Sequence, residues 1–194
     1  MNSEENYQPK VIIFSAPSGA GKTSIVNRLL ELEPRLAFSV SATTRPKRLH
    51  ETEGKDYYFL DKEQFEAKIK KGEFIEWEEV YTNVFYGTLK SEVQRLHEAH
   101  KVAVFDLDVK GGLNIKKHYQ NNALAIFVQP PSLAELEQRL RQRRTETEES
   151  LQKRLAKATY ELGFASQFDH TIINYELDQA VKEAYQLVVK FLNS

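Results

Sequence analysis

Residues 11–26 of the chain read VIIFSAPSGAGKTSIV, and this stretch decides the fold. The first four residues are apolar without interruption, as in a strand that is buried on both faces of a parallel sheet. After Ser15, the eight residues from Ala16 to Thr23 are small residues followed by Gly-Lys-Thr, the pattern of a phosphate-binding loop. Apolar residues then recur on one side of a helix, which must end before Pro34. The stretch therefore predicts a strand, a phosphate-binding loop and a helix.

The loop has the properties that binding a nucleoside triphosphate requires. Small side chains let successive backbone N–H groups turn toward phosphate oxygens, and the helix N-terminus adds a positive dipole. We expect an exposed Lys22 to reach the β- and γ-phosphates of ATP, and the Thr23 hydroxyl to hold Mg²⁺. A solvated glycine-rich turn is the alternative, and the flanking strand and helix argue against it. The residues expected to bind ATP here are Ala16, Pro17, Ser18, Gly19, Ala20, Gly21, Lys22 and Thr23.

One loop position departs from the strict pattern. Ala16 stands where that pattern has glycine. If the φ angle of this residue is negative, a Cβ atom costs little there. The departure therefore does not argue against a phosphate-binding loop.

Short apolar runs and amphipathic stretches alternate along the rest of the chain, which is the pattern of a parallel sheet flanked by helices. Such runs occupy residues 102–105, 123–128 and 171–173. The predicted fold class is α/β with a five-stranded parallel core. We expect a single domain over residues 9–192, whose core consists of residues 9–40, 90–138 and 151–192.

Two segments interrupt this alternation. Residues 41–89 carry short strand-like runs and one helix with Asp61 as its N-cap and Gly72 as its stop, which predicts a small α+β insertion. Residues 139–150 are mostly charged and polar, and a segment of that composition cannot bury itself. We therefore expect an exposed lid at 139–150, without regular structure from Arg141 to Ser150.

Composition excludes several functional classes. The 194 residues include 27 Lys and Arg against 28 Asp and Glu, so the net charge is −1, without the basic excess of proteins that coat nucleic acid or anionic membranes. There are no cysteines, which excludes disulfides and thiolate chemistry. The N-terminus is not that of a signal peptide, and no apolar run approaches the roughly 20 residues that span a bilayer. The expected location is the cytoplasm.

A basic turn lies after the second predicted strand. Arg45 and Arg48 flank Pro46, and the proline restricts their relative motion, as suits a clamp on a phosphate group. A solvated basic loop is the alternative for an isolated turn of this kind. The phosphate-binding loop alone does not choose between classes of nucleotide-binding protein, although the guanine-reading Asn-Lys-x-Asp run of GTPases is absent.

Taken together, the motifs closely resemble those of the guanylate kinase family. The characteristic stretches are residues 39–46, Arg48, residues 54–57 and residues 74–77, and they occur in family order. The resemblance runs from about Pro9 to Leu192. It implies the fold of a P-loop nucleoside monophosphate kinase with a GMP-binding insertion and a lid. It also implies transfer of a phosphoryl group from ATP to GMP, giving ADP and GDP.

The resemblance assigns the acceptor residues. The GMP phosphate is expected to meet Arg45, Arg48, Tyr57 and Tyr86, and the guanine base to be surrounded by Ser41, Glu76, Thr88 and Asp108. The chemistry agrees, because guanine presents N1–H beside an exocyclic amine and one carboxylate can accept both. Adenine lacks that pair of donors. Glu76 is therefore expected to discriminate between purines.

The remaining assignments concern the metal and the lid. Asp106 and Asp108 end an apolar run and can reach the same edge of the sheet, and the resemblance gives Asp106, with Thr23, to Mg²⁺. It also implies that Arg139, Arg143 and Arg154 act with Lys22 on the transferring phosphate, while Arg141 and Arg144 are expected to be solvated. Asn174 falls where family members contact adenine.

Two other interpretations stay open. One is a P-loop kinase for another nucleotide acceptor. The other is a non-catalytic guanylate-kinase-like module that binds phosphorylated peptides. Such a module typically lacks a working P-loop and the lid arginines. The argument against this second interpretation is the presence of Lys22, Thr23, Asp106, Arg139 and Arg143. The expected partners are the small molecules GMP and ATP, not nucleic acid or membrane, and the sequence does not indicate the oligomeric state.

Overall fold

The strand and helix predicted around the phosphate-binding loop are present as β1 and α1. A computed structural model of the chain describes residues 9–142 and 147–194. Its strands are β1 (Val11–Ser15), β2 (Leu36–Phe38), β3 (Ala42–Thr43), β4 (Tyr58–Phe59), β5 (Phe74–Tyr81), β6 (Val84–Leu89), β7 (Val102–Leu107), β8 (Ala123–Gln129) and β9 (His170–Ile173). Its helices are α1 (Lys22–Leu32), α2 (Lys62–Lys70), α3 (Lys90–Glu98), α4 (Val109–Tyr119), α5 (Leu133–Gln142), α6 (Glu148–Leu162) and α7 (Leu177–Leu192), with short 3₁₀ turns at Gln120–Asn122 and Ala165–Gln167.

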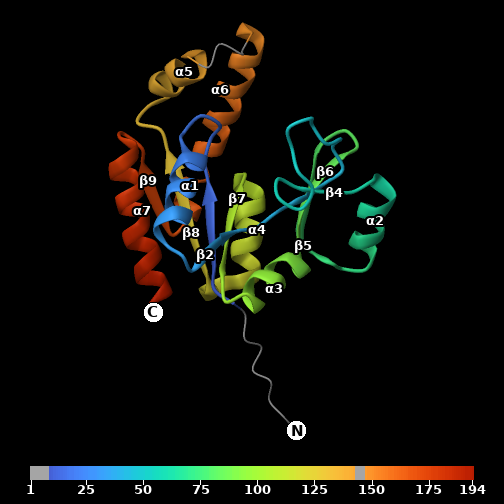
Figure 1. Cartoon of the computed structure of the whole chain (residues 1–194). Helices are drawn as coiled ribbons and strands as arrows, with labels where there is room; N and C mark the ends of the chain where they lie inside the picture. Colours follow the sequence, from blue (N-terminus) through green and yellow to red (C-terminus); the bar gives the residue numbers. More distant parts are fainter. Residues whose placement is uncertain (1–8, 143–146) are drawn as a thin grey trace.

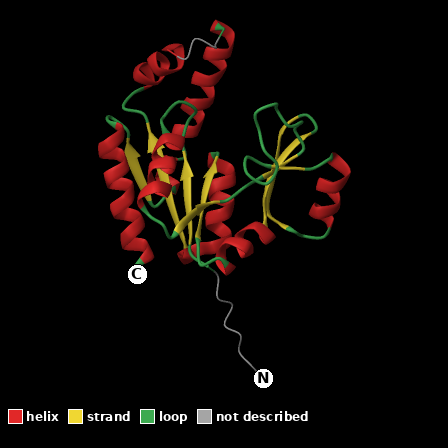
Figure 2. Ribbon diagram, viewed as in Figure 1, coloured by secondary structure: helices red, strands yellow, loops and turns green. Residues whose placement is uncertain are grey.

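The core is a five-stranded sheet in the order β2-β7-β1-β8-β9, and every neighbouring pair is parallel. This confirms the predicted fold class. The strands lie between helices on both faces (Figure 2). The chain crosses from β7 to β8 over the central β1. The carboxyl end of β1 therefore lies at the point where ligands bind in sheets of this kind.

Alternating residues of β1 explain the layers on either side of the sheet. Ile12 and Phe14 pack with α1 and α7, and Val11 and Ile13 pack with α3 and α4. All four side chains are fully buried. Because both faces are covered, the strand is apolar from Val11 to Phe14, as its sequence predicted.

The insertion forms a separate lobe beside the core (Figure 1). Its sheet has the order β4-β3-β6-β5, and α2 packs against it around Phe65 and Phe74, whose rings stack with centroids 4.4 Å apart. The predicted N-cap of α2 is confirmed, since Asp61 and Gln64 form a reciprocal capping box. Gly72 follows the helix with φ 66°, a left-handed conformation that favours glycine.

The polar segment between residues 139 and 150 differs from its prediction. The expectation of an irregular stretch from Arg141 to Ser150 is wrong in extent, because α5 continues to Gln142 and α6 begins at Glu148. Arg141 is not simply solvated: it bonds Glu137 on its own helix and Glu148 on the next. Pairs of opposite charge at i, i+4, such as Glu137 and Arg141, add to the stability of a helix even where its residues are polar. Arg143 and Arg144 lie outside the described residues.

The pair α5 and α6 stands above the carboxyl edge of the sheet (Figure 1). Leu136 and Leu140 of α5 are fully buried against Leu151 and Ala158 of α6. The same two leucines would contact a Cβ atom at Gly19 of the loop. The helices therefore rest directly on the phosphate-binding loop. Among the described residues, no helix combines the length and the apolar composition needed to cross a membrane.

Candidate active site

The phosphate-binding loop connects β1 to α1 and depends on two glycines in left-handed conformations. Gly19 has φ 94° and Gly21 has φ 96°, whereas Ala16 is not among the residues with positive φ, so its Cβ is tolerated. A Cβ atom on Gly21 would overlap Nδ2 of Asn174. The backbone at Gly21 thus requires glycine both for its conformation and for the close approach of a neighbour.

Asn174 supports the loop from below. Its Nδ2 donates to the backbone carbonyl of Ala20 at 2.8 Å, and the residue is only 5% exposed. The amide therefore satisfies a buried carbonyl oxygen of the loop. Its expected contact with the adenine base stays a prediction.

Lys22 differs from its expected exposed conformation. Its ammonium group pairs with Asp106 and donates to the backbone carbonyl of Leu107 at 3.0 Å, so that only 15% of the side chain is exposed. The Thr23 hydroxyl lies 3.1 Å from the second carboxylate oxygen of Asp106. Since Asp106 ends β7 beside β1, the parallel sheet itself brings this acid to the loop.

The two described lid arginines lie near the loop. Arg154 of α6 donates to the Ser18 hydroxyl at 3.3 Å. Arg139 of α5 bonds Glu135 at 3.0 Å and the backbone carbonyl of Asn174 at 3.0 Å. Arg154 therefore contacts the loop directly, whereas Arg139 contacts Asn174, the residue that supports the loop. Arg143, which was expected to act with them, lies outside the described residues.

A cavity of about 300 Å³ opens between the core and the insertion. Five of the residues expected to bind GMP line it, namely Ser41, Tyr57, Glu76, Tyr86 and Asp108. The rings of Tyr57 and Tyr86 meet edge to face with centroids 5.9 Å apart. The Asp108 side chain also caps α4, accepting from the backbone N–H of Gly111 at 2.9 Å.

Glu76 is the most strongly perturbed acid of this cavity. Burial raises its pKa to about 7, and the neighbouring carboxylates of Asp108 and Glu78 add to the shift. The hydroxyl of Thr88 donates to Glu76 Oε1 at 2.8 Å and partly offsets it. Thr88 is fully buried and is not among the residues that line the cavity, and its expected contact with the base stays a prediction. The structure places it behind Glu76, whose carboxylate it orients.

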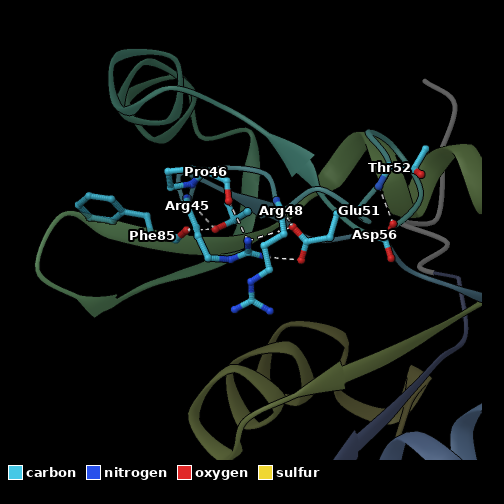
Figure 3. A network of polar contacts seen from close by, with 8 residues as sticks. Arg45, Pro46, Arg48, Glu51, Thr52, Asp56 and Phe85 are labelled. Carbon is cyan, nitrogen blue, oxygen red and sulfur yellow. Dashed lines mark hydrogen bonds and ion pairs between the residues drawn. The ribbon is translucent and has the colours of Figure 1, made fainter.

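The basic turn is held by an acid that the motifs did not indicate. Glu51 accepts from both terminal nitrogens of Arg45, at 3.0 and 2.7 Å, and from the backbone N–H of Arg48 at 2.8 Å (Figure 3). The guanidinium of Arg45 also lies 5.3 Å from the centre of the Tyr57 ring. The Arg45 bond lowers the pKa of Glu51 to about 2. The Arg48 side chain is exposed and extends away from this network.

The phosphate-binding loop lines a second cavity, of about 360 Å³. Asp106, Asp108 and Lys157 line both this cavity and the one that contains Glu76. A phosphate group on the loop would therefore lie next to a ligand in the neighbouring cavity. This arrangement suits direct transfer of a group from one ligand to the other.

Sequence reasoning missed four charged residues of this region: Glu51, Glu78, Lys157 and Glu161. The last two follow Arg154 on α6 at spacings of three and seven residues, so helical periodicity could have found them. Glu51 contacts Arg45 through an irregular turn, and no spacing rule relates the two. Among the described residues, no group of three or more acids and histidines has the arrangement of a metal-binding cluster.

The comparisons with known proteins agree with this geometry. Residues 8–190 match the family model described as guanylate kinase. A guanylate kinase of Bacteroides thetaiotaomicron is 52% identical over 95% of this chain and 90% of its own, and one of Salinibacter ruber is 49% identical over 95% and 97%. The crystal structure of guanylate kinase from Anaplasma phagocytophilum superposes with a TM-score of 0.73 at 28% identity, covering 94% of this chain and 85% of that one.

Proposed function

This chain belongs to the guanylate kinase family and catalyses ATP-dependent phosphorylation of GMP to GDP, and we propose that its loop cavity holds ATP while the neighbouring cavity holds GMP. The observation that carries this assignment is that the two cavities share Asp106, Asp108 and Lys157. With ATP phosphates on the loop, a GMP phosphate oxygen in the second cavity can attack the γ-phosphorus in line. No covalent enzyme intermediate is needed.

In this proposal Lys22 exchanges one anionic partner for another. Without nucleotide its ammonium pairs with Asp106, and the β- and γ-phosphate oxygens of ATP offer a stronger, multiply charged alternative. Its existing contact with Asp106 keeps the charge at the mouth of the loop. Backbone N–H groups between Gly19 and Thr23 bind the same phosphates, supported by the dipole of α1.

We assign Mg²⁺ to Thr23 and Asp106. Their oxygens lie 3.1 Å apart at the loop, and Mg²⁺ characteristically takes one or two protein oxygens together with phosphates and water. Bound Mg²⁺ supplies charge neutralisation at the phosphate oxygens. The two residues belong to β7 and α1, whose relative positions are fixed by the parallel sheet. Removal of divalent cations with EDTA is expected to abolish turnover, and added Mg²⁺ to restore it.

Recognition of guanine falls to Glu76 with Ser41 and Asp108 beside it. Thr88 fixes one oxygen of Glu76, and the carboxylate accepts from guanine N1–H and the exocyclic amine. A Cβ atom on Gly111 would lie 3.4 Å from Glu76 Oε2, so this glycine leaves space beside the carboxylate. The GMP phosphate then reaches Tyr57, Tyr86, Arg45 and Arg48.

Around the transferring phosphoryl group we place Arg139, Arg143 and Arg154. Arg154 already contacts the loop through Ser18, and Arg139 stands one helix away. Guanidinium groups in these places neutralise the charge that develops on the equatorial oxygens. We propose the cytoplasm as the site of this reaction and GMP and ATP as the partners.

A bisubstrate inhibitor tests the two-cavity assignment. Adenosine and guanosine joined through five phosphates can occupy both cavities at once. We expect it to bind with a stoichiometry of one and to compete with both ATP and GMP. A compound that competes with only one nucleotide would place the two sites apart and contradict the assignment.

A further inference from the structure

Lys157 is a charged residue of the cleft that the mechanism above does not use. It lies on α6 between Arg154 and Glu161, at spacings of three and four residues, so all three share one face of the helix. That face is directed at the site, because each of the three lines the loop cavity. Lys157 alone of them also lines the cavity that contains Glu76.

The acceptor cavity is otherwise strongly acidic. Four carboxylates line it, from Glu76, Glu78, Asp106 and Asp108. Among the described residues, Lys157 is the only lysine or arginine that does so. A nucleoside monophosphate carries a charge of about −2 at neutral pH and is repelled by such walls. A cation at the end of the cavity that faces the loop would offset this repulsion where the phosphate must lie.

Glu161 determines where the ammonium group of Lys157 rests. Its Oε1 lies 3.7 Å from Lys157 Nζ, and its own side chain is only 6% exposed. Burial raises the pKa of Glu161, while the charge of Lys157 opposes that shift. Lys157 itself is 59% exposed, so its long side chain can turn from this resting contact toward a ligand.

We propose that Lys157 binds the phosphate group of GMP, as a further substrate-binding residue held ready by Glu161. This inference rests on the assignment of the acceptor cavity to GMP. The ammonium approaches the phosphate from α6, on the side that faces the loop, whereas Arg45 and Arg48 approach from the insertion.

The test compares GMP with guanosine, which lacks the phosphate. Isothermal titration without ATP measures the Kd of each for the wild type and for Lys157→Gln. Removing one charge-assisted hydrogen bond is expected to weaken GMP about tenfold and to leave guanosine within about twofold. Lys157→Arg keeps the charge and is expected to retain most of the GMP affinity. Salt screens the attraction between the Lys157 ammonium and the GMP phosphate. We therefore expect the affinity for GMP to depend less on salt concentration in Lys157→Gln than in the wild type.

Lys153→Gln is the matched control. Lys153 lies on the same helix, is 75% exposed and pairs with Glu149 at 2.6 Å, so its substitution removes the same charge, but it lines neither cavity. We expect its GMP affinity to stay within about twofold of wild type. The proposal is wrong if Lys157→Gln leaves GMP binding unchanged, or weakens guanosine as much as GMP. Failure of the cavity assignment itself would be recognised separately, because Glu76→Gln would then affect neither ligand.

Discussion

Replacing Glu76 by Gln separates recognition of the base from stability of the fold. The substitution keeps the size of the side chain, and Oε1 can still accept from the Thr88 hydroxyl. It replaces the other acceptor with an amide NH₂ group, which would face a guanine N–H and leave two donors opposed. We therefore expect GMP to be used poorly. AMP should gain relative to GMP, because adenine presents a lone pair at N1.

The magnitude follows from the hydrogen bond that guanine can no longer donate. Removing such a charge-assisted bond from a desolvated site costs on the order of 2–4 kcal/mol, or roughly 30- to 1,000-fold in kcat/KM for GMP. The KM for ATP should change little, since ATP occupies the loop cavity. The wild-type enzyme should also show a pH dependence that the variant lacks. Burial raises the pKa of Glu76 to about 7, so below pH 7 the carboxylate that accepts from guanine is lost and kcat/KM for GMP falls by up to about tenfold per pH unit. In Glu76→Gln this fall in kcat/KM should be absent.

The free energy of unfolding depends on pH in the opposite sense to kcat/KM for GMP. The Glu76 carboxyl has a higher pKa folded than its ordinary value of 4.5, so the folded state holds more protons between pH 4.5 and 7. Its contribution to stability is therefore greatest at low pH and is lost as the pH rises through 7. At pH 8, Glu76→Gln avoids an ionised, desolvated carboxylate, and we expect a gain on the order of 2 kcal/mol, or roughly 4–8 °C in Tm.

Steady-state kinetics from pH 5.5 to 8.5, together with thermal melting over the same range, measure both effects. The GMP phosphate itself titrates at about pH 6 and also affects the kinetics. The pH profile of Glu76→Gln contains this phosphate titration without that of Glu76, so comparing the two profiles isolates the contribution of Glu76. Unchanged GMP turnover and an unchanged GMP/AMP ratio would refute the role of Glu76 in binding guanine. A fall in Tm at pH 8 would refute the reasoning about its buried charge.

Two further substitutions test the loop. Lys22→Ala is expected to lower kcat by about 10²–10³-fold, and to weaken the fold slightly because Asp106 loses its partner; near-normal kcat would remove Lys22 from the mechanism. Gly21→Ala combines a left-handed φ with overlap on Asn174, whereas Gly72→Ala has a similar φ and no atom within 4 Å of its Cβ. Thermal melting should show a loss of about 1–2 kcal/mol for Gly72→Ala and clearly more for Gly21→Ala, and equal losses would contradict the close packing under the loop.

Local signals in the sequence predicted the elements that depend on neighbouring residues. The apolar run of β1, the glycines of the loop and the capping box at Asp61 each lie within one short segment, and each is present in the structure. The end of α5 could not be placed in this way. Arg141 continues that helix because it pairs with Glu137 and Glu148, and the latter contact depends on how α5 meets α6.

The residues of the candidate site also fall into those that local motifs indicate and those whose position depends on tertiary packing. Motif resemblance indicated five acceptor residues that line the acceptor cavity, namely Ser41, Tyr57, Glu76, Tyr86 and Asp108. It did not reveal which side chains stand behind others. Thr88 and Asn174 carry the residue types of binding groups, and the fold buries both, where they hold Glu76 and the loop backbone.

Contacts between distant segments were beyond the reach of any spacing rule. Glu92 of α3 is an example: its buried carboxylate accepts from the backbone N–H of Val40 at 3.1 Å and from the Tyr58 hydroxyl at 2.8 Å. These bonds join the core to the insertion at the place where the chain passes between them. Arg95, at i+3 on the same helix, is a local partner of Glu92 that helical spacing indicates. The bonds that Glu92 accepts from Val40 and Tyr58 arise only from tertiary packing, because a charged residue is otherwise expected in solvent.

The central claim is that GMP accepts the phosphoryl group and that its base is selected by the cavity around Glu76. A coupled assay of ADP release, run with ATP and each of GMP, dGMP, AMP, UMP and dTMP, tests it most directly. We expect kcat/KM for GMP to exceed that for AMP, UMP and dTMP by about 10³-fold or more, because those bases leave the carboxylate without its pair of donors. Equal or faster ADP release with AMP, UMP or dTMP would contradict the claim.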